Sequence, residues 1–298
     1  MPPLYHITIL LSVFYETLVV VATSCGKPSA TTQERPSAAI QQTTQASQSS
    51  GRVSFTMASE SDFTVRLADD GTAIITGYTG RGGNIAIPAK IQGVQVTQIG
   101  YGAFGRLNGE EGRANLTGVQ LPEGLKVIDR SAFARSGIST VIIPNTVTEI
   151  GDSAFYQCGR LESISIPDSV TVFGDSIFHG SGLKSFTFPA GLIASKKIPQ
   201  YMFYMTNFEK IDIPAGIEAI GKQALSDCKS LTSATLPSTI KSIDESAFNG
   251  CSSLTEVIIP ESVTSIRFAG GGFSSFLRCN LTLASQAALI QRGHPNYF

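Results

Sequence analysis

Tryptophan is absent from the 298-residue sequence, histidine and cysteine are scarce at three and five residues, and the net charge is close to zero. With 22 Lys+Arg against 23 Asp+Glu, the chain has no overall positive field to hold a nucleic acid or an anionic membrane. Only His179 and His294 lie beyond residue 24, and neither has the spacing of a metal ligand or of a catalytic base. We therefore predict that the protein has no cofactor, no metal site and no catalytic residues.

Two familiar motifs are also missing. No Gly-x-Ser-x-Gly segment, which would indicate a nucleophilic serine, occurs in the chain. The segment Gly80-Arg81-Gly82-Gly83 is rich in glycine, but it lacks the Lys-Ser/Thr pair of a phosphate-binding loop. We interpret this segment as a turn whose backbone geometry needs glycine.

Hydrophobic residues, phenylalanine and glycine are abundant instead. A hydrophobic content of 42% is enough for a buried core. The chain has 17 Phe and 29 Gly, which indicates that Phe fills one repeated structural role while Gly supplies many turns.

The first residues have the pattern of an export signal. Residues 4–23 form an apolar stretch that ends in the small-x-small pattern Ala-Thr-Ser. Glu16 interrupts it, and no Lys or Arg precedes it. Cys25 and Gly26 follow, so the segment also resembles a bacterial lipobox, in which the Cys thiol is diacylated. We predict a signal peptide at residues 1–24 and lipidation at Cys25, which would make the protein a cell-surface or outer-membrane lipoprotein. Plain cleavage, which would leave the protein periplasmic or secreted, and an uncleaved anchor are the alternatives.

Residues 25–51 consist mostly of Ser, Thr, Gln and Ala. Such a segment cannot bury enough apolar surface to offset its chain entropy. We predict a disordered tether with a root-mean-square span of roughly 25 to 30 Å, which would hold a folded domain away from a membrane.

Proline recurs at a nearly constant interval along the rest of the chain. Aligned on these prolines, the segments share the frame LxxIxIPxxVxxIGxxAFxxCxx. The steps are 22, 23, 22, 25, 23 and 23 residues, between prolines at 122, 144, 167, 189, 214, 237 and 260. A fixed period of this length predicts a solenoid of stacked units.

The frame closely resembles the repeat of the BspA-type bacterial surface leucine-rich-repeat family. The resemblance extends from about Ile74 to the C-terminus. It implies a repeat solenoid, namely a leucine-rich-repeat right-handed superhelix that is β-rich, with short parallel β-strands and irregular turns. It also implies attachment to host extracellular-matrix or plasma proteins, or to neighbouring bacteria.

The folded part, residues 52–298, divides into three predicted regions. Residues 52–115 form an N-terminal capping coil, residues 116–266 carry the regular repeats, and residues 267–298 form a C-terminal cap. In that last region Ser285 is positioned to N-cap a short helix over residues 286–292, with Gly293 at its end. Two insertions, at residues 105–115 and 190–197, depart from the repeat, and we expect them to bulge from one face.

Side-chain alternation predicts which way each residue of the frame points. Leu161, Ile164 and Ile166 occupy apolar positions and point into the core, while the residues between them point outward. The glycine that follows the VxxI stretch of the frame is predicted to adopt a turn conformation that side chains resist, at Gly100, Gly151, Gly174 and Gly221. The Phe residues are predicted to stack as a spine at about 4.8 Å per coil, with Leu225 replacing one of them. They are Phe104, Phe133, Phe155, Phe178, Phe203 and Phe248.

The presence of cysteine correlates with the length of the turn between the spine residue and the next strand. Where the spine residue precedes the next strand by six residues, a Cys occupies the third position, as Cys158 does between Phe155 and Leu161. Where the interval is five, Cys is absent. A small buried wedge explains this pattern, so we favour reduced cysteines. The alternative is a disulfide between Cys228 and Cys251, which lie one period apart.

The outward strand positions form a candidate binding surface, because a solenoid presents them as a rigid grid. Most are Ser or Thr, which also simply suit exposed strands. Charged residues of both signs occur in three successive coils, and this mixed-charge patch is the candidate partner-binding site. It consists of Glu162, Lys184, Glu209, Lys210 and Asp212.

These observations together predict a non-catalytic, adhesin-like surface binding protein. Its leucine-rich-repeat face would engage a protein ligand such as a host matrix or plasma protein. The alternative is a structural or assembly protein of the cell envelope that pairs with other envelope proteins or with itself. In both cases no nucleic acid is involved, and the membrane is contacted only through an N-terminal lipid or anchor.

Overall fold

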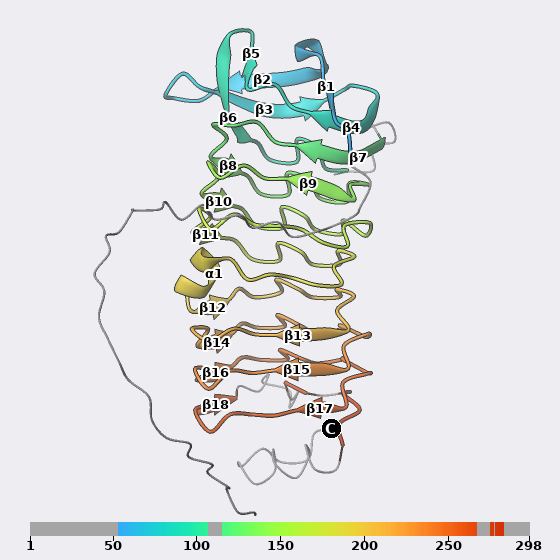
Figure 1. The fold of residues 1–298 in the computed structure, drawn as a ribbon, viewed down its shortest axis with the longest axis vertical. Helices are drawn as coiled ribbons and strands as arrows, with labels where there is room; N and C mark the ends of the chain where they lie inside the picture. The colour runs from blue at the N-terminus through green and yellow to red at the C-terminus, as the bar shows by residue number, and fades with distance from the viewer. Residues whose placement is uncertain (1–52, 107–114, 267–274, 277, 283–298) are drawn as a thin grey trace, which may run out of the picture. The chain divides into compact units, whose positions relative to one another are not determined.

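The computed structural model describes residues 53–106, 115–266, 275–276 and 278–282, all within the unit Gly51–Phe298 (Figure 1). The predicted signal peptide, Cys25, the tether and the C-terminal helix lie outside these residues. Within the described part of the chain, no helix has the length and apolar character needed to cross a bilayer.

Short parallel strands from successive coils form two faces of the solenoid (Figure 1). We call the first the strand face. It carries the sheet β1 (Thr56–Met57), β4 (Gly82–Ala86), β7 (Asn115–Gln120) and β9 (Thr140–Ile142), and farther along the sheet β13 (Lys210–Asp212), β15 (Ser233–Thr235) and β17 (Glu256–Val257). We call the other the opposite face. It carries β2 (Phe63–Leu67), β3 (Ala73–Tyr78), β6 (Val94–Ile99), β8 (Val127–Ile128), β10 (Glu149–Ile150) and β11 (Val172–Phe173), and then β12 (Lys197–Ile198), β14 (Ala219–Ile220), β16 (Ser242–Ile243) and β18 (Ser265–Ile266).

Antiparallel pairing is confined, among the described strands, to the N-terminal coil. There β2 pairs with β3, and β5 (Lys90–Ile91) pairs with β6. The 3-10 helix η1 (Glu60–Asp62) leads into β2. Phe63 in β2 places its ring 5.1 Å from the Tyr78 ring and 6.5 Å from the Phe104 ring. This reversal covers the end of the apolar core, which stacked coils alone leave open.

The predicted side-chain alternation is confirmed. Leu161, Ile164 and Ile166 are buried, whereas Glu162 and the serines between them are exposed. The same pattern recurs from coil to coil, so apolar side chains from both faces form one continuous core. Each coil buries its apolar residues mainly against its neighbours, and stability therefore comes from stacking.

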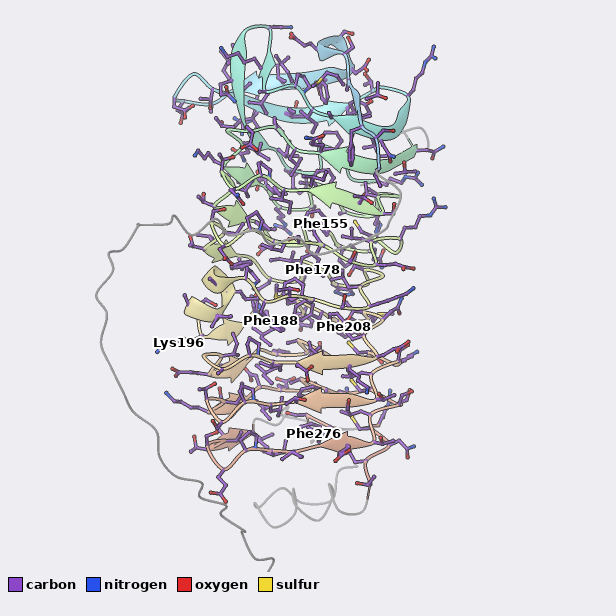
Figure 2. All side chains as sticks on the ribbon, viewed as in Figure 1. Phe155, Phe178, Phe188, Lys196, Phe208 and Phe276 are labelled. Carbon is purple, nitrogen blue, oxygen red and sulfur yellow. The ribbon has the colours of Figure 1, made fainter. Side chains whose placement is uncertain are left out.

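The phenylalanine spine is also confirmed, and it lies in the interior of the stack (Figure 2). From Phe104 to Phe203 the rings stack within 10° of parallel, at centroid distances of 5.1, 5.5, 5.7 and 6.0 Å. These distances exceed the predicted 4.8 Å. Leu225 is fully buried in its coil, and Phe276, which was not predicted, stacks on Phe248 at 5.2 Å. The ladder thus continues into the segment predicted as a C-terminal cap.

The predicted role of the frame glycines is wrong. Gly151, Gly174 and Gly221 are not among the residues with a left-handed backbone, which falls two residues later, at Ser153, Ser176 and Gln223. The glycines are needed for close approach between coils. A Cβ on Gly221 would lie 2.6 Å from the Ile198 carbonyl oxygen, and one on Gly151 would lie 2.7 Å from the Arg130 nitrogen. Gly100 follows the same rule, with the Ile75 oxygen at 2.9 Å.

The four cysteines in the described residues are free and buried. Each thiol donates a hydrogen bond of 3.1 Å to the carbonyl of the spine residue one coil earlier. The turn-length rule fails at Cys279, which occurs where Phe276 and Leu281 are only five residues apart. The coils without Cys carry a buried Ser or Thr at the same position, namely Ser136, Ser181 and Thr206. The position therefore selects a small side chain, and turn length does not decide which one.

A break interrupts the opposite face between β11 and β12. The predicted insertion forms the helix α1 (Ala190–Ala194), which lies between these strands and carries the chain outward (Figure 1). In other coils a frame residue such as Gly174 or Gly221 donates its N–H to the preceding coil, but Pro199 occupies this position after α1 and has no N–H. The ladder stops there, and a cavity of about 420 Å³ lies beside Phe173 and Pro199.

Candidate protein-binding surface

Hydroxyl side chains on the strand face largely serve the fold. At the second strand position, Ser139 donates to the Thr117 carbonyl at 3.0 Å, and Thr232 donates to the Glu209 carbonyl at 2.9 Å. Thr117 itself donates to the Asn84 side chain at 2.7 Å. These bonds join neighbouring coils. They show why Ser and Thr dominate this column, and they weigh against a hydroxyl surface selected for binding.

The mixed-charge patch departs from this pattern. In three successive coils the second position is Glu162, Lys184 or Glu209. The structure brings the first two together, with Lys184 Nζ 2.8 Å from Glu162 Oε1. Their side chains are 58% and 62% exposed, so the pair adds little stability and leaves both charges accessible to a partner.

The rest of the patch lies on β13. Lys210 and Asp212 are exposed on either side of the buried Ile211. Two coils between β9 and β13 have no assigned strand on this face, although the Lys184 N–H still donates to the Glu162 carbonyl at 3.0 Å. The patch therefore spans a segment of the strand face in which backbone pairing is sparse.

A second set of charges, which sequence reasoning missed, lies on the opposite face. Glu218 pairs with Lys196 at 2.9 Å and with Lys241 at 2.5 Å. Hydrogen bonds from Lys241 and Lys196 lower the pKa of the Glu218 carboxyl. The three residues are 22 and 23 positions apart, so the repeat itself carried the signal. Lys196 points away from the stack (Figure 2).

An aromatic column follows the turns after the spine residues. The His179 ring lies 4.7 Å from Tyr156 and 4.6 Å from Tyr204. Burial between these rings lowers the pKa of His179. Burial, and then the 2.8 Å hydrogen bond that the Tyr204 hydroxyl donates to Asp227, raise the pKa of Tyr204 to about 12. His179 thus packs as part of the column.

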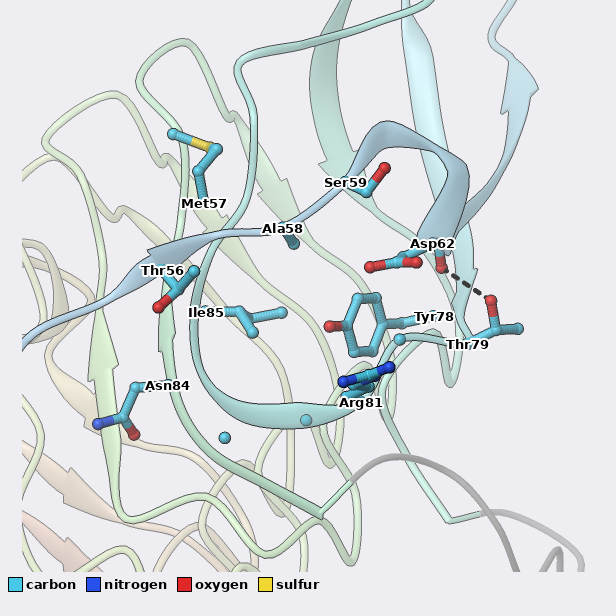
Figure 3. Close-up of a pocket in the computed structure, with 13 residues that line it drawn as sticks. Thr56, Met57, Ala58, Ser59, Asp62, Tyr78, Thr79, Arg81, Asn84 and Ile85 are labelled. Carbon is cyan, nitrogen blue, oxygen red and sulfur yellow. Dashed lines mark hydrogen bonds between the residues drawn. The ribbon is translucent and has the colours of Figure 1, made fainter.

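The glycine-rich turn at residues 80–83 borders a cavity of about 580 Å³ in the N-terminal coil (Figure 3). Gly82 and Gly83 have φ of +85° and +80°, which confirms that the turn needs glycine for its backbone geometry. Tyr78 and Arg81 line the cavity together with Asp62. Within the described residues, no three side chains of the metal-binding types come together.

A stack of short parallel strands around a core of Leu, Ile and Phe defines a leucine-rich-repeat solenoid. The sequence profile described as "BspA type Leucine rich repeat region" matches the chain in 6 copies, over residues 84–195 and 196–281. The protein therefore belongs to the BspA-type leucine-rich-repeat family, as the repeat frame predicted.

Two solved structures of repeat proteins are similar to this chain. A leucine-rich-repeat protein of T. pallidum is 26% identical, with 80% of this chain and 96% of that chain covered and a TM-score of 0.53. A leucine-rich cell surface protein of Faecalibacterium prausnitzii is 21% identical, with 72% and 86% covered and a TM-score of 0.35. Among curated protein sequences, none matches.

Proposed function

We propose that this protein is a non-catalytic, adhesin-like binding protein, exported and held at the cell surface, whose strand face engages a protein ligand. The observation that carries the proposal is the mixed-charge patch. It replaces the hydroxyl column in three successive coils, at the position where hydroxyls bridge the other coils, and exposes charges of both signs on a rigid scaffold.

The shape of the face favours a protein over a small molecule. Its side chains form an open grid with a fixed spacing from coil to coil, and small molecules bind in concave pockets. Exposed charges of both signs give specificity through complementary charges on a partner. Ile142 and Ile258, which are 44% and 73% exposed, occupy the same strand position on either side of the patch. They would add apolar contacts to the interface.

The proposed partner is a host matrix or plasma protein, in keeping with the surface location that the family suggests. Export would depend on residues 1–24, and lipidation of Cys25 would anchor the tether. Labelling cells with a fatty-acid probe tests the anchor, and we expect the label to disappear in Cys25→Ala. A label that persists would remove Cys25 as the attachment point.

A solid-phase assay of the full chain against immobilised matrix and plasma proteins tests the binding face. The variant Glu162→Lys/Lys184→Glu/Lys210→Glu reverses three charges of the patch. We expect saturable binding by the native protein and a loss of about tenfold or more in this variant. A matched control, Lys222→Glu/Glu245→Lys, exchanges a 3.2 Å ion pair at the edge of the opposite face and should bind normally.

Two results would count against the proposal. Binding that is unchanged by the three reversals would remove the patch. Crosslinking on intact cells that recovers only envelope proteins, or a second copy of this chain, would favour the structural role instead.

A further inference from the structure

Three arginines from successive coils line a pocket on the turn edge, where the chain passes from the spine to the next strand-face segment. The pocket has a volume of about 480 Å³. It is lined by Arg106, Arg135 and Arg160 with Asn115, Gly137 and Gly159, and none of the lining residues that the structure describes is acidic. It is separate from the mixed-charge patch, and its volume is within the range of small-ligand sites.

Neutral groups hold two of these guanidinium groups in place. Arg106 Nη2 donates to Asn115 Oδ1 at 3.3 Å, and Arg135 Nε donates to Gln157 Oε1 at 3.0 Å. The Arg135 guanidinium also lies over the Tyr156 ring, 5.6 Å from its centroid. Amide oxygens and an aromatic ring fix a guanidinium without cancelling its charge. Neutral groups thus position both guanidinium groups.

Several lysines, in contrast to these three arginines, form ion pairs with described residues. All four ion pairs among the described residues join a lysine to a glutamate. Arg106, Arg135 and Arg160 form no ion pair with any residue that the structure describes. Three like charges in one pocket repel each other, and an anion relieves that repulsion.

The pocket also has room for a ligand on the side that Gly159 lines. A Cβ added to Gly159 would meet nothing within 4 Å, so this side of the pocket has free space. Planar guanidinium groups form paired hydrogen bonds with tetrahedral oxyanions, and arginine is the preferred side chain for this geometry.

We propose that the arginine pocket, formed by Arg106, Arg135 and Arg160, binds a sulfate or phosphate group. The source of the group is either a sulfated saccharide or a free inorganic anion. The proposal stands apart from the strand-face function, because no residue of the mixed-charge patch lines the pocket.

Isothermal titration of the full chain with four probes tests this site. The probes are a heparin-derived tetrasaccharide, the same saccharide without its sulfates, inorganic sulfate and inorganic phosphate. We expect the sulfated tetrasaccharide or the inorganic anions to bind, and binding to weaken as salt rises. If the tetrasaccharide binds and inorganic sulfate or phosphate does not displace it, the saccharide is the source of the group. If only inorganic sulfate or phosphate binds, the ligand is a free ion.

Two variants of equal net charge distinguish binding in the pocket from non-specific attraction by the charge of the whole protein. The variant Arg106→Gln/Arg135→Gln/Arg160→Gln should weaken binding about tenfold or more, since it removes the charged donors. Gln suits the backbone of Arg135, because Gln157 has the same left-handed conformation one coil later. The control Arg66→Gln/Arg81→Gln/Arg130→Gln removes three exposed arginines elsewhere and should change binding less than about twofold.

A third variant tests the pocket without touching an arginine. Gly159→Asp places a carboxylate in its open side and should abolish binding while the melting temperature stays close to native. Three results would overturn the proposal: equal weakening by the two triple variants, equal binding of the saccharide without sulfates, or no binding by any probe.

Discussion

At several positions of this repeat, the residue type is determined by its contact with the neighbouring coil. The position three residues after each spine residue takes Cys158 in one coil and Ser136 or Thr206 in others, always small and buried. Cys158 donates to the Phe133 carbonyl and Thr206 to the Phe203 carbonyl, whereas Ser181 Oγ has no partner among the described residues, so small size is what the position requires. The sequence pattern located the Cys but missed the Ser and Thr, because hydroxyl residues are common throughout the chain and gave no contrast.

Neighbouring coils approach each other closely at the frame glycines, so a side chain added there should destabilise the fold. Gly221→Ala should lower the free energy of unfolding by about 1–3 kcal/mol, since its Cβ would press on the Ile198 oxygen. Gly159→Ala is the matched control, because its Cβ meets nothing within 4 Å, and it should leave stability within about 0.5 kcal/mol of native. Chemical denaturation measures both. Equal effects would show that the two glycines are needed for backbone freedom alone.

The buried thiol of Cys158 gives a pH dependence. Burial raises the pKa of this thiol from 9.0 to about 11. A pKa raised by folding contributes stability that is complete below pH 9 and is lost as pH rises through 11, because the unfolded chain releases the proton first. The loss should reach about 2–3 kcal/mol. Denaturation midpoints measured from pH 8 to 11 check it.

The control for this titration is Cys158→Ser, since Ser occupies the same position at Ser136 and Ser181. Tyrosines and lysines also titrate in this range, so the difference between the two proteins isolates the thiol. Parallel pH curves for both proteins would show that Cys158 does not contribute.

At the level of elements, the break beside α1 divides the ladder of the opposite face. The 25-residue proline step located the insertion in the sequence. The helix itself was not predicted, because five residues from Ala190 to Ala194 carry no capping side chain or amphipathic pattern. The coil that leads into the helix has a more aromatic core than its neighbours. Phe186 and Phe188 lie 4.9 and 6.2 Å from the Phe203 ring, where other coils carry aliphatic residues.

Hydrogen exchange should reveal the break as a step in protection. Lys196 N–H bonds within the helical turn, to Ile193, and Pro199 has no N–H, so two bonds that join neighbouring coils elsewhere are missing. We expect peptides covering residues 189–200 to exchange faster than those covering β8 and β10, or β14 and β16. Mass spectrometry at low denaturant measures this, and uniform protection across the whole stack would contradict it.

The periodicity of a repeat protein determined how much could be read from its sequence. The length of the repeat, the inward-pointing positions and the Phe spine could be predicted from residues such as Leu161 and Phe155. Each of these features recurs in several coils, so a single irregular coil does not obscure the pattern. The arginine pocket and the Lys196, Glu218 and Lys241 network were missed. The arginines are 29 and 25 positions apart and do not follow the repeat, so only the structure brings them together, whereas the spacing of the Lys196, Glu218 and Lys241 network follows the repeat and was sufficient to predict it.

For the whole molecule, the spine predicts that stability depends on a large apolar side chain in every coil. Phe155 stacks between Phe133 and Phe178, so Phe155→Ala should cost about 3–5 kcal/mol of unfolding free energy. Phe155→Leu keeps most of the apolar volume, as the buried Leu225 does in its coil, and should cost less. Thermal and chemical denaturation compare the two variants. Equal losses would show that the volume of the spine residue does not govern stability.

The whole-molecule claim that matters most for function is that partners bind the strand face. A photo-crosslinking residue at Ser163 or Ser185 would sit on that face beside the mixed-charge patch, and one at Thr148 would sit beside the opposite face; all three positions are exposed. Full-length protein carrying each probe is illuminated with a mixture of matrix and plasma proteins. We predict one crosslinked partner from Ser163 and Ser185 and none from Thr148. Equal crosslinking from all three positions, or a partner captured only from Thr148, would contradict this account of the binding surface.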